Sequence, residues 1–171
     1  MTNVFLIGFM GSGKSTIAWC LAKNYGMDMI DMDQLIVERE GMSISDIFTQ
    51  KGELYFRDAE TKLLIEMEME QNKVVSCGGG VVLREENVHA MKKCGQVVLL
   101  DAKPETILER VKDDDNRPLL RGNKNVQFIR DMMAKRQPKY EAAADFVIHT
   151  DEKSADMICK EIIEKVKKTG E

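Results

Sequence analysis

Gly8-Phe9-Met10-Gly11-Ser12-Gly13-Lys14-Ser15-Thr16 decides the fold of this chain, because it matches G-x-x-x-x-G-K-[ST], the pattern of a phosphate-binding loop. The flanking residues supply the context that this pattern needs. Residues 3–7, Asn-Val-Phe-Leu-Ile, are short, apolar and rich in β-formers, which predicts a buried parallel strand. After the loop, one face of a predicted helix carries Ile17, Cys20, Leu21 and Tyr25. A strand, this loop and a helix in succession predict a site for a nucleoside triphosphate.

The residue types of the loop suit a crowded group of negative charges. Its glycines let the backbone curl with N–H groups turned inward, and the following helix adds its positive N-terminal end. Lys14 can reach the β- and γ-phosphates, and the hydroxyl of Ser15 can take one position on Mg²⁺. The nucleotide-binding residues expected here are Gly11, Ser12, Gly13, Lys14, Ser15 and Thr16. The alternative is a glycine-rich turn without a ligand.

The composition limits the partners and the location of the protein. The 171 residues suit one domain, 1–171, and the net charge of −4 comes with no basic block, so we expect no nucleic-acid partner. The cysteines at 20, 77, 94 and 159 are far apart, which predicts buried thiols in a reducing cytosol rather than disulfides or a zinc site. Without a signal-type segment or an apolar run of membrane length, we expect a cytoplasmic protein, not a membrane protein, and a monomer.

Short apolar segments alternate with helical patterns about five times, which is typical of an α/β protein with a parallel sheet covered by helices on both faces. The periodicity predicts a long helix over 53–71 and another over 126–136, which Pro138 should kink or restart. Ligands bind such sheets at the carboxyl ends of the strands. The residues that directly follow predicted strands should therefore gather on one rim: the phosphate loop, Asp31, Asp33, Gly78 to Gly80, and Asp101.

Asp31 and Asp33 stand two residues apart, where a strand gives way to a helix or loop. One carboxylate near Ser15 could hold Mg²⁺ through water, and the other could orient an attacking hydroxyl. The alternative for Asp33 is a cap on the following helix, because aspartate is common at that position.

Three arginines are candidates for binding negative charge. Arg57 lies beside the apolar face of the long predicted helix, and Glu60 follows one turn later, where it can hold the guanidinium. Arg57 and Arg136 together suit one small carboxylate, because each planar guanidinium can bind it bidentately. Arg117 lies in the polar segment 113–123, which predicts a mobile loop that can close over a γ-phosphate. The alternatives are ordinary surface salt bridges and a solvated loop.

The chain as a whole resembles the shikimate kinases. The motifs that carry the resemblance follow the phosphate loop in the order seen in that family: Asp31-Met32-Asp33, Phe56-Arg57-Asp58-Ala59-Glu60, Gly78-Gly79-Gly80, Arg117-Pro118-Leu119-Leu120 and Arg136-Gln137-Pro138-Lys139-Tyr140. The resemblance implies an α/β P-loop kinase fold, with a central five-stranded parallel sheet, a helical substrate-binding insertion at about 33–60 and a mobile lid at about 113–123. It also implies transfer of the γ-phosphoryl of ATP to the 3-hydroxyl of shikimate, on the route to chorismate and the aromatic amino acids.

The resemblance assigns roles by position. The catalytic residues that it implies are Asp33, as base or orienter of the ring hydroxyls, Lys14, and Arg117 on the phosphates. The implied shikimate-binding residues are Asp33, Arg57, Gly78, Gly79, Gly80 and Arg136. Ser15 and Asp31 would serve Mg²⁺, and Arg110 looks like an adenine-stacking residue. Cys77 stands where many relatives have threonine, which puts a hydroxyl-specific contact there in doubt.

Two other functions fit parts of the sequence. A related small kinase could act on gluconate or on a nucleoside monophosphate. A nucleotide acceptor would need a base pocket and no carboxylate clamp, whereas a sugar acid could share the clamp. A GTP switch is a different class, and Asn123-Lys124-Asn125-Val126 begins the N-K-x-D guanine-reading pattern but lacks its aspartate.

Overall fold

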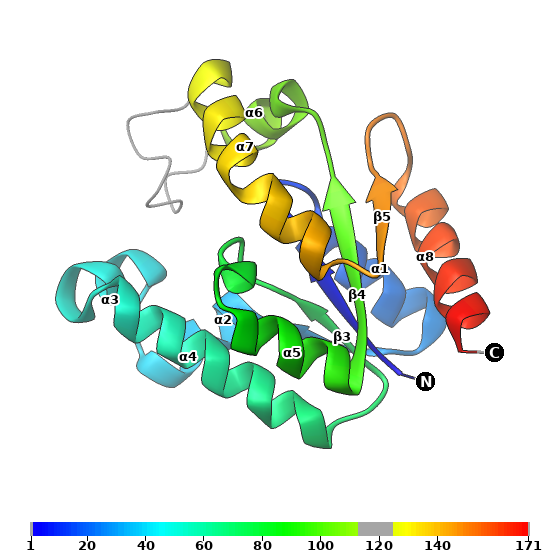
Figure 1. The fold of residues 1–171 in the computed structure, drawn as a ribbon, viewed down its shortest axis with the longest axis horizontal. Helices are drawn as coiled ribbons and strands as arrows, with labels where there is room; N and C mark the ends of the chain where they lie inside the picture. Colours follow the sequence, from blue (N-terminus) through cyan, green and yellow to red (C-terminus); the bar gives the residue numbers. More distant parts are fainter. Residues whose placement is uncertain (1, 113–124, 171) are drawn as a thin grey trace.

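A five-stranded parallel sheet, in the order β2-β3-β1-β4-β5, forms the centre of the computed structural model, which describes residues 2–112 and 125–170 (Figure 1). The strands are β1 (Asn3–Ile7), β2 (Asp28–Asp31), β3 (Lys73–Ser76), β4 (Gly95–Asp101) and β5 (Phe146–His149), and each neighbouring pair is parallel. The register places Ser76 beside both Leu6 and Asp31. The carboxyl ends of β1, β2 and β3 therefore meet at one edge, as the sequence predicts.

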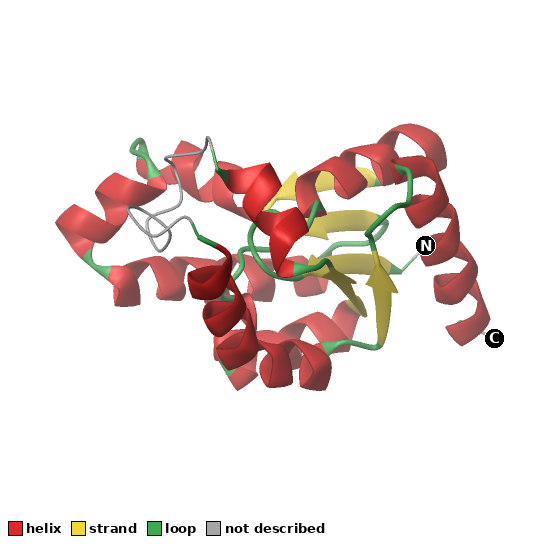
Figure 2. Cartoon of the chain, turned by 90° about the horizontal axis from the view of Figure 1, so that it is seen from above, coloured by secondary structure: helices red, strands yellow, loops and turns green. Residues whose placement is uncertain are grey.

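Helices cover both faces of the sheet, as Figure 2 shows. They are α1 (Lys14–Tyr25), α2 (Met32–Glu40), α3 (Ile44–Lys51), α4 (Glu53–Glu66), α5 (Glu85–Cys94), α6 (Pro104–Val111), α7 (Val126–Ala143) and α8 (Ala155–Thr169). Short 3₁₀ helices, η1 (Met67–Met69) and η2 (Val81–Leu83), come before and after β3. In Figure 1, α3 and α4 extend away from the sheet beyond α2.

The two faces of β1 bury different side chains, because successive residues of a strand point to opposite sides. Val4 and Leu6 belong to a core cluster that contains residues of α1 and α8: Ile17, Leu21, Ile158 and Ile162. Phe5 and Ile7 belong to a second cluster that contains residues of α4, α5 and α7: Leu64, Met91 and Ile129. Both faces of the central strand are fully buried, which explains why residues 3–7 are apolar without alternation.

The long helix predicted over 53–71 is shorter in the structure. Helix α4 ends at Glu66, and after η1 the chain turns into β3. The side chain of Asn3 explains the change, because its Nδ2 donates to the carbonyl of Glu70 at 2.8 Å and to that of Met67 at 3.5 Å. These carbonyls are thereby bound by a strand residue that lies 64 and 67 positions away in the sequence, a contact that helix periodicity does not encode.

The helix predicted over 126–136 does not restart at Pro138, contrary to expectation. Helix α7 continues through it to Ala143. Its buried residues, Ile129, Arg136, Tyr140 and Ala143, form one stripe on both sides of the proline, while Pro138 itself is exposed. Packing of this stripe against the molecule compensates for the hydrogen bond that proline removes.

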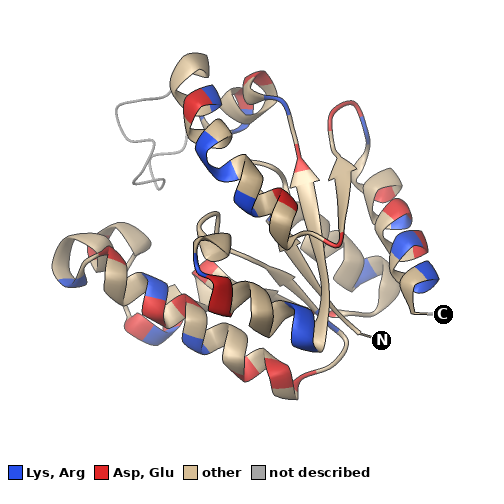
Figure 3. Cartoon of the chain, in the orientation of Figure 1, with Lys and Arg blue, Asp and Glu red and all other residues tan. Residues whose placement is uncertain are grey.

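The surface charges are mixed, as the small net charge predicts. In Figure 3, Lys and Arg alternate with Asp and Glu over the outer helices. All four cysteines are free, and three of them are buried, whereas Cys94 is only half-buried. No helix in the described ranges is long and apolar enough to cross a membrane.

The contacts of Asn3 generate a stability prediction. Its Oδ1 also accepts from the backbone N–H of Lys73 at 2.9 Å. Asn3→Ala therefore leaves the carbonyl of Glu70 and the N–H of Lys73 without this hydrogen-bond partner. We expect the free energy of unfolding to fall by about 1–3 kcal/mol, the usual cost of an unsatisfied buried group. Urea denaturation measures it, with Gln71→Ala, an exposed residue of the same turn, as the control. Equal stability of the two variants would contradict this account of the turn.

Candidate functional site

The phosphate loop has a backbone that only glycine fits easily. Gly13 has φ +101° and directly precedes α1, and Gly11 has φ +80°. A β-carbon on Gly11 would also lie 2.7 Å from Cγ1 of Val111, so a larger residue would collide with α6. The loop consequently folds tightly over the N-terminus of α1, where unpaired N–H groups favour an anion.

Lys14 is held against the loop from which it comes. Its Nζ donates to the carbonyl oxygens of Gly8 at 2.7 Å and Phe9 at 3.0 Å. These bonds keep the ammonium beside the backbone of the phosphate loop.

Three oxygen-bearing side chains meet beside the loop. The hydroxyl of Ser15 donates to Oδ2 of Asp31 at 3.0 Å and lies 3.2 Å from the hydroxyl of Ser76. The other oxygen of Asp31 accepts from the backbone N–H of Gln34 at 3.2 Å. Asp31, rather than Asp33, therefore caps α2, which answers the alternative considered for Asp33. Sequence reasoning missed Ser76, although its position directly at the end of β3 was a usable signal.

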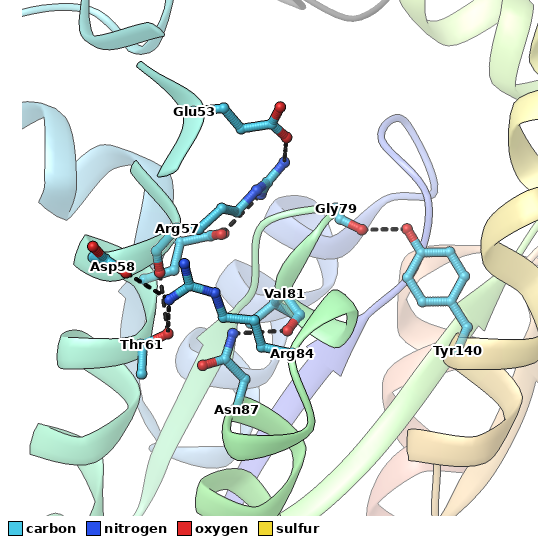
Figure 4. Close-up of polar contacts among 10 residues, drawn as sticks. Glu53, Arg57, Asp58, Thr61, Gly79, Val81, Arg84, Asn87 and Tyr140 are labelled. Carbon is cyan, nitrogen blue, oxygen red and sulfur yellow. Dashed lines mark hydrogen bonds and ion pairs between the residues drawn. The ribbon is translucent and has the colours of Figure 1, made fainter. Parts of the chain in front are cut away.

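Two glutamates of its own helix bind Arg57, and Figure 4 shows the contact with one of them, Glu53. Its Nη1 lies 2.8 Å from Oε1 of Glu60, and its Nη2 lies 3.2 Å from Oε1 of Glu53. Arg57 is 9% exposed and Glu60 is fully buried. Burial raises the pKa of Glu60, and the charge of Arg57 opposes that rise. The predicted Arg57–Glu60 pair is confirmed, whereas the contact with Glu53 was not predicted.

Residues 78–80, which we call the glycine run, are closely covered by charged side chains. A β-carbon on Gly80 would overlap Nη1 of Arg57 and lie 2.6 Å from its Cζ. One on Gly78 would overlap Oε2 of Glu60 and lie 3.2 Å from Oδ1 of Asp33. None of these glycines has a positive φ, so the run is needed for space rather than for an unusual backbone. It brings the arginine of α4 and the aspartate of α2 together.

A second arginine reaches the same run from the other side. Nη1 of Arg136 lies 3.4 Å from where a β-carbon of Gly79 would be, and among the described residues this buried nitrogen has no hydrogen-bond partner. The hydroxyl of Tyr140, one turn later on α7, donates to the carbonyl of Gly79, as Figure 4 shows. Burial raises the pKa of Tyr140, which keeps that hydroxyl a donor. Tyr140 belongs to one of the sequence motifs, but the sequence alone predicted no role for it.

A cavity of about 610 Å³ joins the phosphate loop to the residues around the glycine run. It is lined by Lys14, Ser15 and Thr16 of α1, by Asp31, Asp33 and Gln34 near the start of α2, and by Gly79 and Arg110. Arg110 is exposed, and its Nη1 donates to the carbonyl of Gly11 at 2.9 Å. Arg117 and the expected lid at 113–123 lie outside the described residues. The other predicted site residues are thus gathered at one edge of the sheet.

Known proteins of one family are similar to this chain over almost its whole length. The family model described as shikimate kinase matches residues 10–167. A shikimate kinase of Persephonella marina is 45% identical over 98% of this chain and 100% of its own length. A shikimate kinase of Sulfurihydrogenibium sp. is 43% identical over 98% of this chain and 99% of its own length. The solved structure of a shikimate kinase from Acinetobacter baumannii in complex with shikimate has a TM-score of 0.93 and 33% identity, covering 99% of this chain and 94% of that one. The chain therefore belongs to the shikimate kinase family.

Proposed function

We propose that this protein transfers the γ-phosphoryl group of ATP to the 3-hydroxyl of shikimate, giving shikimate 3-phosphate and ADP on the route to chorismate. One observation carries the proposal: two buried arginines converge on the glycine run beside the cavity that the phosphate loop lines. A clamp for a small carboxylate and a loop for a triphosphate thus share one site. The names of the relatives and the shikimate in the Acinetobacter complex support shikimate as the acceptor.

In this proposal the loop at 8–16 binds the phosphates of ATP. Its backbone N–H groups and the N-terminus of α1 surround them, and Lys14 exchanges the carbonyls of Gly8 and Phe9 for phosphate oxygens. Positive charge at this point stabilises the transition state more than the ground state, because charge shifts toward the leaving oxygen during transfer. Arg110, beside Gly11, is proposed to stack on the adenine.

Arg57 and Arg136 are proposed to bind the shikimate carboxylate between them. Glu60 fixes Arg57, and Tyr140 fixes the backbone of Gly79, so the clamp is in place before the substrate binds. The backbone N–H groups of Gly79 and Gly80 would add donors at the same point. Most of the catalytic benefit is then orientation: the ring is held with one hydroxyl toward the phosphate loop.

Asp33 is proposed to orient the 3-hydroxyl and to accept its proton. It lies in the first turn of α2 and lines the cavity beside Gln34 and Gly79. Since Asp31 supplies the helix cap, Asp33 is not needed for that purpose. Phosphoryl transfer passes through a loose transition state, so positioning of the hydroxyl contributes more than early removal of its proton.

Mg²⁺ is the proposed metal, and Ser15 and Asp31 are its proposed ligands. Their oxygens lie 3.0 Å apart beside the loop, and Ser76 adds a third oxygen. No cluster of three His, Cys, Asp or Glu side chains able to hold a metal occurs among residues 2–112 and 125–170, and this donor set suits a cation that keeps waters and phosphate oxygens as its other ligands. Ser15 and Asp31 would hold Mg²⁺ there, and the ion would supply positive charge that offsets the negative charge developing during phosphoryl transfer.

We further propose that the enzyme works as a monomer in the cytoplasm. The four free thiols suit a reducing compartment that supplies ATP.

An ADP-release assay tests the proposed function. Purified protein is given Mg²⁺-ATP with shikimate, gluconate or a set of nucleoside monophosphates. We expect shikimate to stimulate ADP release far more than the other acceptors. Stimulation only by gluconate or only by a nucleoside monophosphate would refute the assignment of the acceptor.

Arg57→Lys should weaken the use of shikimate and leave the use of ATP unchanged. Lysine keeps the charge but loses the planar fork that binds a carboxylate bidentately, and we expect the apparent KM for shikimate to rise about tenfold, on 1.5 kcal/mol for a hydrogen bond to a charged group. Arg39→Lys is the matched control, since Arg39 forms a bidentate pair with Glu66 on the surface. A rise in the KM for ATP alone would place Arg57 in the nucleotide site instead.

Asp33→Asn should lower kcat by at least about a hundredfold, on the range known for a positioned general base. The change is nearly isosteric, and the amide oxygen can still accept one hydrogen bond, so we expect a smaller effect on shikimate binding. Steady-state kinetics and calorimetry measure the two effects separately. A kcat within a few-fold of the wild-type value would reduce Asp33 to a ground-state contact.

A further inference from the structure

We propose that Glu53 occupies the edge of Arg57 that the substrate carboxylate needs, and that shikimate binds by displacing it. The inference rests on the proposed function and adds a residue that sets affinity and selectivity for the acceptor. It follows from a difference between the two glutamates that bind Arg57, one of which is buried and the other exposed.

Glu60 and Glu53 hold different nitrogens of the same guanidinium. Nη1 is bound by Glu60, whose side chain is fully buried. Nη2 is bound by Glu53, whose side chain is 55% exposed and lies on the first residue of α4. Glu53 can therefore swing into water at little cost, whereas moving Glu60 would leave a charge buried and unpaired.

Nε, the third nitrogen of the Arg57 guanidinium, indicates which edge of this group can receive the substrate carboxylate. Nε of Arg57 is buried and has no hydrogen-bond partner among the described residues. Nε–H and one N–H of Nη2 point in the same direction along one edge of a guanidinium, and this edge is one of the two that bind a carboxylate bidentately. The other edge includes Nη1, which Glu60 already holds. Glu53 thus binds Nη2, the nitrogen that both edges share and that a bidentate substrate carboxylate needs.

The charges around the glycine run also favour displacement of Glu53 by the substrate carboxylate. Arg57 and Arg136 carry two positive charges, and Glu60 and Asp33 carry two carboxyl groups next to them. With Glu53 in place, a substrate carboxylate would add a further negative charge to a crowded anionic group. When Glu53 leaves, the incoming carboxylate takes over its ion pair, so no buried cation is left without a partner at any stage.

Glu53→Gln should therefore tighten the binding of shikimate. The variant removes the competing charge, and we expect the dissociation constant measured by calorimetry without nucleotide to fall roughly two- to fivefold, the range for an exposed ion pair. Glu85→Gln is the matched control, because Glu85 is exposed and begins α5 as Glu53 begins α4. It removes the same charge from the same helix position and leaves Arg57 untouched, so its dissociation constant should equal that of the wild type.

The methyl ester of shikimate tests whether the substrate carboxylate is the group that competes with Glu53 for Arg57. The ester carries no charge to exchange for Glu53, so Glu53→Gln should improve its binding by much less than it improves that of shikimate. Unchanged or weaker shikimate binding by Glu53→Gln, or an equal gain for the ester, would overturn the inference alone. Failure of the wild-type protein to bind shikimate would overturn the proposed function and this inference with it.

Discussion

The absence of side chains at residues 78–80 is the constraint on which the rest of the site depends. The run follows β3, which lies between β1 and β2 at the centre of the functional edge. Because its backbone is bare, the guanidinium of Arg57 and the carboxyl of Glu60 can lie directly on it, and Arg136 can approach from α7. Helices α2, α4 and α7 thereby bring Asp33, Arg57 and Arg136 to this run beside the phosphate loop.

The charged cluster lowers the stability that this part of the fold could have, and the proposed function explains why it is present. A buried ion pair such as Arg57–Glu60 recovers little more than the desolvation penalty of its two partners, and apolar residues of similar size would stabilise the fold at least as well. A clamp for a carboxylate, however, needs a guanidinium whose orientation is fixed before the substrate arrives. Glu60 supplies that fixed orientation from the buried side, which leaves the opposite edge of Arg57 for exchange between Glu53 and the substrate.

Local signals in the sequence predicted much of this site. The strand, phosphate loop and first helix follow from one continuous motif, and the Arg57–Glu60 pair follows from its spacing of three residues on a helix. Contacts between distant segments could not be predicted. Asn3 limits α4 through a bond to Glu70, and Ser76 meets Ser15 only because β3 lies beside β1. The cap could not be assigned to Asp31 rather than Asp33 from sequence, since both stand at the junction of strand and helix.

The binding of shikimate and ADP to Gly80→Ala is the most direct test of the central claim. The added methyl group would overlap Arg57, which Glu60 prevents from moving aside, while the phosphate loop is untouched. Calorimetry should show shikimate affinity reduced roughly ten- to hundredfold, corresponding to the loss of about 1.5–3 kcal/mol of charged hydrogen bonding. ADP affinity should stay close to that of the wild type, whereas the thermal transition should fall, because the methyl group strains the buried Arg57–Glu60 pair. A folded variant that binds shikimate normally would contradict the claim that the bare glycine run positions the clamp.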